Sequence, residues 1–345
     1  MKRYGHLWSE IVSDENLRIA HATARKGKTW QDDVRRVDRE IDTLIPALQV
    51  QLELGLYKTG KYSSRQLTER GKDRTIFRLP YWPDRVVQHA VCQVLAPIWR
   101  SQLVRHTYAS IPGRGIHDAA TILRDQLRTD RPGTEYCLKM DVRQFYPSIR
   151  HDIMKRVLRD RVKDPRVLVW LDEVIDSISV SEPGRGLPIG NYLSQWLANL
   201  FLAEADWRFK QHYKIRYYHR YCDDIVALSG SKEHLHEVRT DFIGWLKTEY
   251  ALDVKGDWQV FPVAVRGIDF VGYRFFHEKT LLRKKLKKRM ARALSPARAA
   301  RSEVLYRRGM SATPSYDGWT RFGSNRNLRR KLIDNWVLEA KNANR

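Results

Sequence analysis

The chain has 345 residues, 42% of them hydrophobic, and its 63 Lys or Arg outnumber 40 Asp or Glu for a net charge of +23. This composition indicates a folded protein of two or three domains with a polyanionic partner, above all nucleic acid. No apolar run is long enough to cross a bilayer and the first residues lack a signal-peptide core, so we expect a cytoplasmic protein without membrane contact. Three distant cysteines exclude a disulfide framework.

The N-terminal part of the chain is predicted to be helical. Apolar residues at helical spacing predict an amphipathic helix over residues 34–52. A second helix is expected from Val86, with Asp84 as its N-cap. Both helices are expected to pack on a sheet. The segment before residue 60 is interpreted as a brace for the neighbouring region, with binding of a partner as the alternative.

The stretch EYCLKMDV, residues 135–142, is expected to form a buried strand that ends at Asp141. Two helices are predicted after it, over 153–162 and 165–178. After a glycine-rich loop, Ser194 is expected to cap a long helix that runs to about His212.

The stretch RYYHRYCDDIVALSG, residues 216–230, places Asp223 and Asp224 between two strand-like runs. Aromatic and aliphatic residues on both sides suit a half-buried hairpin. An acidic pair in that position is costly unless it has a function. A helix over 232–250 and short strands over 256–276 are expected to follow.

Asp141 and the pair Asp223–Asp224 form two carboxylate sites, 82 residues apart in sequence. If their strands are neighbours, three carboxylates converge and repel one another unless divalent cations neutralise them, and Mg²⁺ suits such oxygen ligands. Two ions roughly 3.5–4 Å apart activate a 3′ hydroxyl and stabilise a departing pyrophosphate. For Asp141 alone, a turn or cap is the ordinary alternative.

The excess charge concentrates near the C-terminal end. Residues 281–345 hold 18 Lys or Arg against 4 Asp or Glu. Apolar residues recur every four positions in TLLRKKLKKRMARAL, which predicts a helix with one packing face and basic remaining faces; the apolar positions are Leu282, Leu286, Met290 and Leu294. A merely solvated surface is the alternative, but acidic residues would then be interspersed. We therefore predict contact with nucleic acid.

Six ordered motifs resemble those of reverse transcriptases. YCDDIVAL resembles their YxDD signature, and LKMDVRQFYPSI resembles the block that supplies their first metal-binding aspartate. GKDRTIFRLPYWPDRVVQHAV, TYASIPGRGIHDA, GLPIGNYLSQWLANLFL and GIDFVGYRF resemble the fingers segment, the next block, the template-and-nucleotide loop and the hairpin that closes the palm. The resemblance extends over about residues 30–345. PIGNYLSQ, RVVQHA and the short basic C-terminus most resemble the enzymes of diversity-generating retroelements.

This resemblance implies an α+β, right-hand polymerase fold with fingers, a palm with an antiparallel sheet, and an all-helical thumb. The expected divisions are a helical extension (1–60), fingers (61–135), a palm (136–280) with inserted fingers helices (about 151–195), and a basic thumb (281–345). The implied activity is RNA-directed DNA polymerisation, a nucleotidyl transfer that uses two Mg²⁺ ions, for which Mn²⁺ substitutes. The thumb would read duplex shape rather than sequence.

The resemblance also implies roles for individual residues. The metal ligands would be Asp141, Asp223 and Asp224 with the backbone of Val142, although strand neighbours face opposite ways unless the turn rotates one. Nucleic acid would contact a set of basic residues in the thumb, namely Arg283, Lys284, Lys287, Lys288, Arg292, Arg329 and Arg330. Trp319 and Trp336 are expected to anchor the small core beneath them.

Nucleotide contacts are implied for six residues, namely Lys72, Arg74, Phe145, Ile189, Gly190 and Gln195. Lys72 and Arg74 would hold the triphosphate, with exposed loop cations as the alternative. Phe145 would stack under the sugar and exclude a 2′ hydroxyl, although a core aromatic is a close competitor and only one of Phe145 and Tyr146 can face the sugar.

The glycine-rich loop is implied to meet the substrates. Gly186 and Gly190 would let the backbone approach nucleotide and template, whereas such glycines elsewhere merely turn the chain. Gln195 and Ser194 brace the next helix in the alternative interpretation. Ile189 replaces the Gln of commoner reverse transcriptases and cannot donate hydrogen bonds, so looser checking of the new base pair is expected.

The retroelement resemblance implies error-prone copying at template adenines. The implied partners are template RNA, the RNA/DNA duplex, dNTPs and a small basic accessory protein. Three alternatives remain: a defence-associated or other bacterial reverse transcriptase, a silent RNA-binding scaffold on the same fold, and an RNA-dependent RNA polymerase, which the aromatic at Phe145 disfavours.

Overall fold

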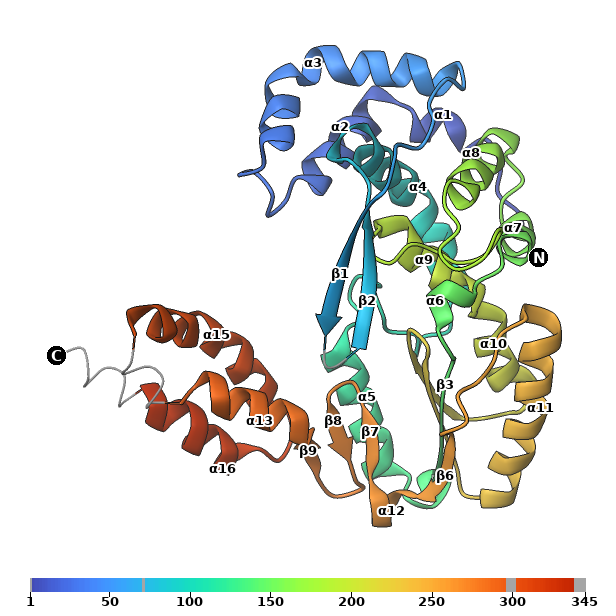
Figure 1. Cartoon of the computed structure of the whole chain (residues 1–345). Helices are drawn as coiled ribbons and strands as arrows, with labels where there is room; N and C mark the ends of the chain where they lie inside the picture. Colours follow the sequence, from blue (N-terminus) through green and yellow to red (C-terminus); the bar gives the residue numbers. More distant parts are fainter. Residues whose placement is uncertain (1, 70–71, 296–301, 338–345) are drawn as a thin grey trace. The chain divides into compact units, whose positions relative to one another are not determined.

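The computed structural model describes residues 2–69, 72–295 and 302–337 (Figure 1). The contacts within the chain define two compact units, each built from three segments. Unit 1 contains Met1–Ile111, Asp141–Tyr213 and Asp241–Gly256. Unit 2 contains Pro112–Met140, Lys214–Thr240 and Asp257–Arg345. The chain thus passes repeatedly between the units, so sequence neighbours such as Met140 and Asp141 belong to different ones.

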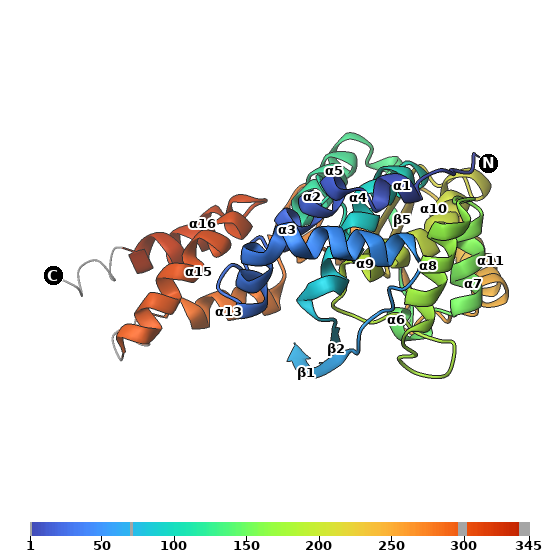
Figure 2. The ribbon, with the colours of Figure 1, turned by 90° about the horizontal axis from the view of Figure 1, so that it is seen from above.

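Unit 1 is mostly helical. Its helices are α1 (Trp8–Ile11), α2 (Asp14–Ala24), α3 (Asp32–Glu53), α4 (Val86–Gln102), α6 (Phe145–Ser148), α7 (His151–Arg159), α8 (Pro165–Asp176), α9 (Tyr192–Phe201) and α10 (Ala203–Trp207), with π-helical η1 (Tyr81–Arg85) and η3 (Arg208–His212). Helix α3 confirms the predicted amphipathic helix, since Val34, Val37 and Ile45 are fully buried. Helix α4 packs against α2 and α9 (Figures 1 and 2).

The prediction that Asp84 caps α4 is wrong. Asp84 lies inside η1 and is 1% exposed. Its carboxylate accepts hydrogen bonds from the Tyr57 hydroxyl at 2.7 Å and the Gly60 backbone N–H at 2.8 Å. A buried carboxylate needs such donors to offset its loss of water. Asp84 therefore anchors the loop after α3 rather than a helix end.

Ser194 is not the cap of the helix that follows the glycine-rich loop. Helix α9 begins at Tyr192 with Asn191 as its N-cap, and Ser194 is a buried residue of the first turn. The helical path does reach His212, as predicted, but as three pieces: α9, α10 and η3.

A two-stranded sheet in unit 1 is formed by β1 (Ser63–Glu69) and β2 (Lys72–Arg78), which pair antiparallel with Leu67 opposite Arg74. Most of its side chains are exposed. Its only other backbone link is the hydrogen bond from the Phe77 N–H to the Ile189 carbonyl, at 2.8 Å, among the residues that the structure describes.

Unit 2 contains a four-stranded sheet in the order β4-β5-β3-β6. The strands are β4 (Tyr217–Tyr221), β5 (Asp224–Ser229), β3 (Tyr136–Asp141) and β6 (Gln259–Pro262), and only the last residue of β3 belongs to unit 1. Strands β4 and β5 pair antiparallel, as do β3 and β6. The predicted strand that ends at Asp141 and the predicted hairpin are both confirmed.

The rest of unit 2 is a small sheet with helices around it. The sheet consists of β7 (Ile268–Phe270), β8 (Tyr273–Phe275) and β9 (Thr280–Leu282). The helices are α5 (Ile116–Thr129), α11 (Lys232–Tyr250, which continues into unit 1), α12 (Val263–Arg266), α13 (Lys284–Ala293), α15 (Glu303–Arg321) and α16 (Arg326–Arg329), with η2 (Pro132–Thr134) and η4 (Arg330–Asp334). Helix α5 packs on β4 and β8.

The C-terminal helices α13, α15 and α16 form one group (Figure 2). Leu286 and Met290 lie on the buried face of α13, as predicted. Leu282 does not belong to that helix, because it is a buried residue of β9. Trp336 is 2% exposed and confirms the expected anchor of this core, whereas Trp319 is half-buried and its ring lies 5.2 Å from that of Tyr273. No helix of the described segments is long and apolar enough to cross a bilayer.

Candidate active site

The acidic hairpin β4–β5 turns sharply at Cys222 and Asp223. Tyr221 pairs with Asp224, so only these two residues form the turn, and Cys222 has a φ of 59°. Arg220, which is fully buried, donates a hydrogen bond of 2.9 Å to the Cys222 carbonyl. Asp223 therefore lies in a braced turn while Asp224 starts a strand. The two adjacent aspartates therefore do not follow the simple alternation of strand neighbours.

The hairpin is fixed by burial on both faces. Tyr218, His219, Ile225 and Val226 are all fully buried. The His219 ring hydrogen-bonds the Gln126 side chain of α5, at 2.7 Å. Dense packing of this kind holds the turn in one position.

Asp224 is paired with a lysine of the neighbouring strand. The Lys139 Nζ lies 2.5 Å from the Asp224 Oδ1, and the side chains of Lys139 and Asp224 are 24% and 26% exposed. Residues two apart in a strand face the same side, so Lys139 and Asp141 share a face of β3. Buried Cys137 also shares it, and burial raises the pKa of its thiol to about 12.

Asp141 is paired with a lysine as well. Its carboxylate forms an ion pair with Lys255, and the Lys255 N–H donates to the Asp141 carbonyl at 2.9 Å. Val142 forms an isolated antiparallel bridge with Val254. Because that bridge uses the Asp141 carbonyl and the Arg143 N–H, the Val142 carbonyl points to the other side. The sequence analysis did not predict that these lysines pair with the aspartates. Only Lys139 could have been recognised, because it lies two residues before Asp141 in the same strand.

The carboxylates are the oxygen ligands that a divalent cation prefers, so the donor chemistry of these residues fits a magnesium site. Each of Asp141 and Asp224 currently has an ammonium as counter-ion. Within the described ranges, no three His, Cys, Asp or Glu side chains gather closely enough to hold a metal ion.

The aromatic predicted to face the sugar is in the core. Phe145 is 2% exposed, and its ring lies 6.5 Å from that of buried Phe201. The neighbouring Tyr146 is half-buried. Since only one of the two can face a nucleotide, this packing favours Tyr146, the accessible aromatic, over Phe145, which packs in unit 1.

The glycines of the loop before α9 approach the protein's own backbone. A Cβ on Gly190, whose φ is 115°, would lie 2.7 Å from the Phe77 carbonyl oxygen. One on Gly186, whose φ is 97°, would lie 2.7 Å from the Val180 Cβ. Both glycines are therefore required by the fold itself. Ile189 is held by its carbonyl, which accepts from the Phe77 N–H.

The remaining predicted nucleotide contacts lie in two places of unit 1. Arg74 is exposed on β2, and Lys72 starts that strand, with its side chain outside the described part. Gln195 is half-buried in the first turn of α9, where it lines a cavity together with Gly190.

The predicted basic surface divides into two kinds of residue. Arg283 binds Asp269, with its Nε 2.6 Å from the carboxylate, and Arg329 binds both Asp317 and Asp334. Both arginines are thus paired with carboxylates of unit 2, and their contact with nucleic acid stays a prediction. The exposed members are Lys284, Lys288, Arg292 and Arg330, while Lys287 is half-buried.

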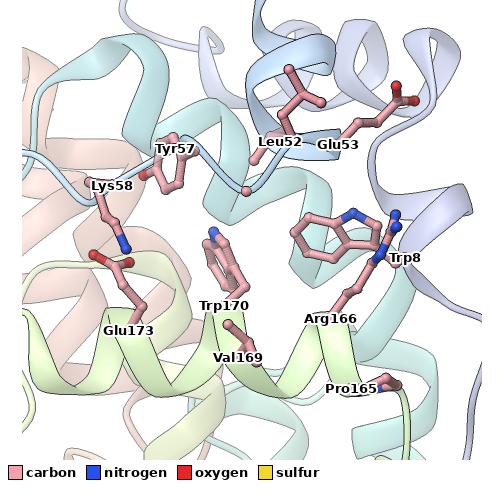
Figure 3. Close-up of a pocket in the computed structure, with 12 residues that line it drawn as sticks. Trp8, Leu52, Glu53, Tyr57, Lys58, Pro165, Arg166, Val169, Trp170 and Glu173 are labelled. Carbon is pink, nitrogen blue, oxygen red and sulfur yellow. The ribbon is translucent and has the colours of Figure 1, made fainter.

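A second cavity, of about 360 Å³, lies between α8, α1 and the end of α3 (Figure 3). Trp8 and Trp170 line it beside apolar Leu52 and Val169, and Arg166 extends along its side. This cavity could not be predicted from local patterns, because its residues come from three separate segments.

Comparison with solved structures defines the class of fold. The structure of telomerase from Candida albicans in complex with a fragment of telomeric RNA matches 70% of this chain and 51% of its own, with a TM-score of 0.50 and 12% identity. With the mixed helix and sheet architecture, this is the α+β, right-hand polymerase fold.

The family follows from the sequence comparison. Residues 61–275, more than half of the chain, match the model of the reverse transcriptase (RNA-dependent DNA polymerase) family, and the chain belongs to that family. Protein YkfC of Escherichia coli (strain K12) is 26% identical over 241 residues, which cover 59% of this chain and 63% of YkfC. The putative COX1/OXI3 intron 2 protein of Saccharomyces cerevisiae is 19% identical over 254 residues, which cover 55% of this chain and 29% of that protein. The chain thus spans less than two thirds of either relative.

Proposed function

We propose that the chain is an RNA-directed DNA polymerase that synthesises cDNA from an RNA template. One observation carries the proposal: within the family match, Asp141 ends β3, Asp224 begins β5, and these strands are neighbours in one sheet. Side chains at the ends of neighbouring strands are well placed to act on one substrate. A protein that only binds RNA gains nothing from carboxylates beside a polyanion.

Asp141, Asp223 and Asp224, with the Val142 carbonyl, would hold the divalent cations. We propose two Mg²⁺ ions, with Mn²⁺ as a substitute; when bound, such ions activate a 3′ hydroxyl and neutralise charge on the transferred phosphate. The carboxylates would exchange their lysine partners, Lys139 and Lys255, for the ions. Asp223 lies in the turn that Arg220 braces through the Cys222 carbonyl.

The other residues would position the substrates. Lys72 and Arg74 would bind the triphosphate, one as a point charge and one as a forked donor. Tyr146, in place of Phe145, would contact the sugar and exclude a 2′ hydroxyl, since it is the accessible ring of the pair. Ile189, Gly190 and Gln195 would flank the new base pair, and the exposed lysines and arginines of α13 would hold the backbone of the duplex.

We further propose that the chain divides into an N-terminal extension, fingers, palm and thumb at residues 60, 135 and 280.

We also propose that the chain belongs to the diversity-generating retroelement class. Ile189, which cannot donate a hydrogen bond, supports frequent misincorporation at template adenines. A structured template RNA and a small basic accessory protein would be the partners. A cytoplasmic location is part of this proposal, supported by three free cysteines.

Primer extension on an RNA template tests the activity. We expect dNTP-dependent extension that requires Mg²⁺ and copies the template. Binding without extension would favour the silent scaffold, and products unrelated to the template would favour the defence-associated class. Sequencing the cDNA tests the subclass: errors spread evenly over all four template bases would overturn it, whereas Ile189→Gln is expected to raise accuracy at adenines.

A further inference from the structure

Unit 1 contains a polar cavity that none of the three carboxylates lines. It is a cavity of about 280 Å³ between the turn after α2, the start of α4 and the start of α9. Its lining consists of Lys28, Arg85, Gln88, His89, Gly190, Asn191, Tyr192 and Gln195. Every lining residue except the glycine is polar or aromatic, and none is acidic. A cavity of this character does not suit an apolar ligand.

Two positive charges meet in this cavity without a carboxylate. The pKa of Lys28 is lowered, first by burial and then by the nearby charge of Arg85. The pKa of Arg85 is also lowered, first by burial and then by the charge of Arg78. The Lys28 Nζ donates to the Ala24 carbonyl at 2.7 Å. In the part of the chain that the structure describes, no residue forms an ion pair or side-chain hydrogen bond with Arg85. An anion would offset the cost of keeping these cations together and partly out of water.

Neutral polar side chains lie beside the two cations. Gln88 is 3% exposed, and no described residue hydrogen-bonds its side chain. The His89 ring stacks on Tyr192 at 4.3 Å between ring centres. Burial, Lys28 and Arg85 lower the pKa of His89 to about 4, so this ring is neutral near pH 7. Gln88 is thus an almost wholly buried side chain without a hydrogen-bond partner in a cationic cavity. This indicates a binding site rather than a solvated surface.

Helix α9 adds a further favourable feature. Its first turn lines the cavity through Tyr192 and Gln195, and its N-cap, Asn191, forms no side-chain capping bond. The first N–H groups of a helix have no intrahelical acceptor, and the helix dipole favours negative charge there.

We propose that this cavity binds a phosphate group, held by Lys28 and Arg85 with Gln88 as a hydrogen-bond donor. The inference rests on the proposed polymerase function, which supplies two sources of that chemistry: a backbone phosphate of the template RNA and the triphosphate of an incoming nucleotide. The Arg85 guanidinium offers several N–H donors in one plane, and the Lys28 ammonium adds a compact positive charge. Together they suit the phosphate oxygens of either source. Lys28 thereby gives the N-terminal segment a role in substrate binding rather than only in bracing.

The test compares Lys28→Gln and Arg85→Gln with the wild-type chain in binding a fluorescent single-stranded RNA of 20 nucleotides, by anisotropy over a range of salt. If the template supplies the phosphate, each variant weakens binding about tenfold. The slope of log affinity against log salt falls by about 0.7 for one lost contact. Arg166→Gln is the matched control, because Arg166 is an exposed cation of the same unit, at the other cavity. Lys28→Arg keeps the charge and should bind like the wild type.

A second arm measures the dNTP KM of the same variants in primer extension. If the nucleotide supplies the phosphate, the KM rises about tenfold while RNA affinity is unchanged. The proposal is overturned if neither quantity changes, or if Arg166→Gln has the same effect as Arg85→Gln. Thermal unfolding checks each variant, and Lys28, which is half-exposed, remains a valid test should Arg85→Gln misfold. The RNA arm involves no catalysis, so failure of the wild-type chain to extend a primer would count against the polymerase proposal alone.

Discussion

Two β-hairpins of this protein, β1–β2 and β4–β5, differ in what surrounds them. Both are antiparallel pairs of strands. The β4–β5 pair continues into a four-stranded sheet and is buried on both faces, whereas β1–β2 is a separate two-stranded sheet with mostly exposed side chains. Isolated two-stranded sheets are marginally stable in water. The packing around the buried hairpin therefore fixes its side chains, whereas few side chains of the exposed hairpin are held by neighbours.

The largest expected effect comes from the turn of the buried hairpin. Asp223→Asn keeps the size of the side chain and removes its charge, so a bound cation loses a ligand. Primer extension should fall about a thousandfold or more, because metal stabilisation of the transition state contributes several kcal/mol. Asp257→Asn, at an exposed position of the same unit, is the control. Equal activity of the two variants would remove Asp223 from the active site.

The difference in packing predicts a difference in stability. Ile225→Ala in the buried hairpin should lower the free energy of unfolding by about 2–5 kcal/mol, because it leaves a cavity at a fully buried site. Leu67→Ala in the exposed hairpin, where the side chain is 42% exposed, should change it by no more than about 0.5 kcal/mol. Urea unfolding measures both. If both variants lost a similar amount of unfolding free energy, the two hairpins would not differ in how firmly they are packed.

Arg74 tests what the exposed hairpin contributes. Arg74→Ala should raise the dNTP KM about tenfold, the value of one charge-assisted hydrogen bond, with little change in stability. Arg65→Ala, on the partner strand and also exposed, is the matched control. If both variants raise the KM equally, the hairpin acts through its general charge and not through Arg74.

The smallest expected effect concerns the lysine partner of Asp141. Lys255→Met removes a cation that competes for the carboxylate, so Mn²⁺ affinity should rise about fivefold, equivalent to about 1 kcal/mol. Electron paramagnetic resonance of free Mn²⁺ measures this without catalysis. Lys247→Met is the control, since its ion pair with Asp253 is on the surface. Unchanged affinity for Lys255→Met would mean that the lysine does not oppose metal binding.

Several elements were predictable because local spacing controls them. Helix α3, strand β3 and the hairpin around Asp223 follow from the period of their apolar residues. The predictions that failed concern single side chains. Asp84 and Ser194 have the chemistry of caps, yet long-range packing places one on the loop after α3 and the other in a buried turn. Cap chemistry in the sequence does not reveal which partners the fold brings near.

The candidate site shows the same limit. The acidic motif predicted which residues carry the chemistry, but not that Lys139 and Lys255 pair with them, because those contacts span 85 and 114 residues. Neither could the sequence decide between Phe145 and Tyr146, which are adjacent and chemically alike. The packing of Phe145 against Phe201 is what favours Tyr146 as the ring that would face the sugar.

The sequence by itself determined the family, the acidic hairpin and the basic C-terminal helices, because short motifs and periodic patterns depend on neighbours in the chain. The tertiary structure alone decided which arginines of the basic set are held by Asp269 and Asp317, which glycines serve the fold, and that Lys28, Arg85 and Gln88 line one cavity. Those features depend on segments that are distant in sequence, and their meeting follows from the burial of the whole core rather than from any local preference.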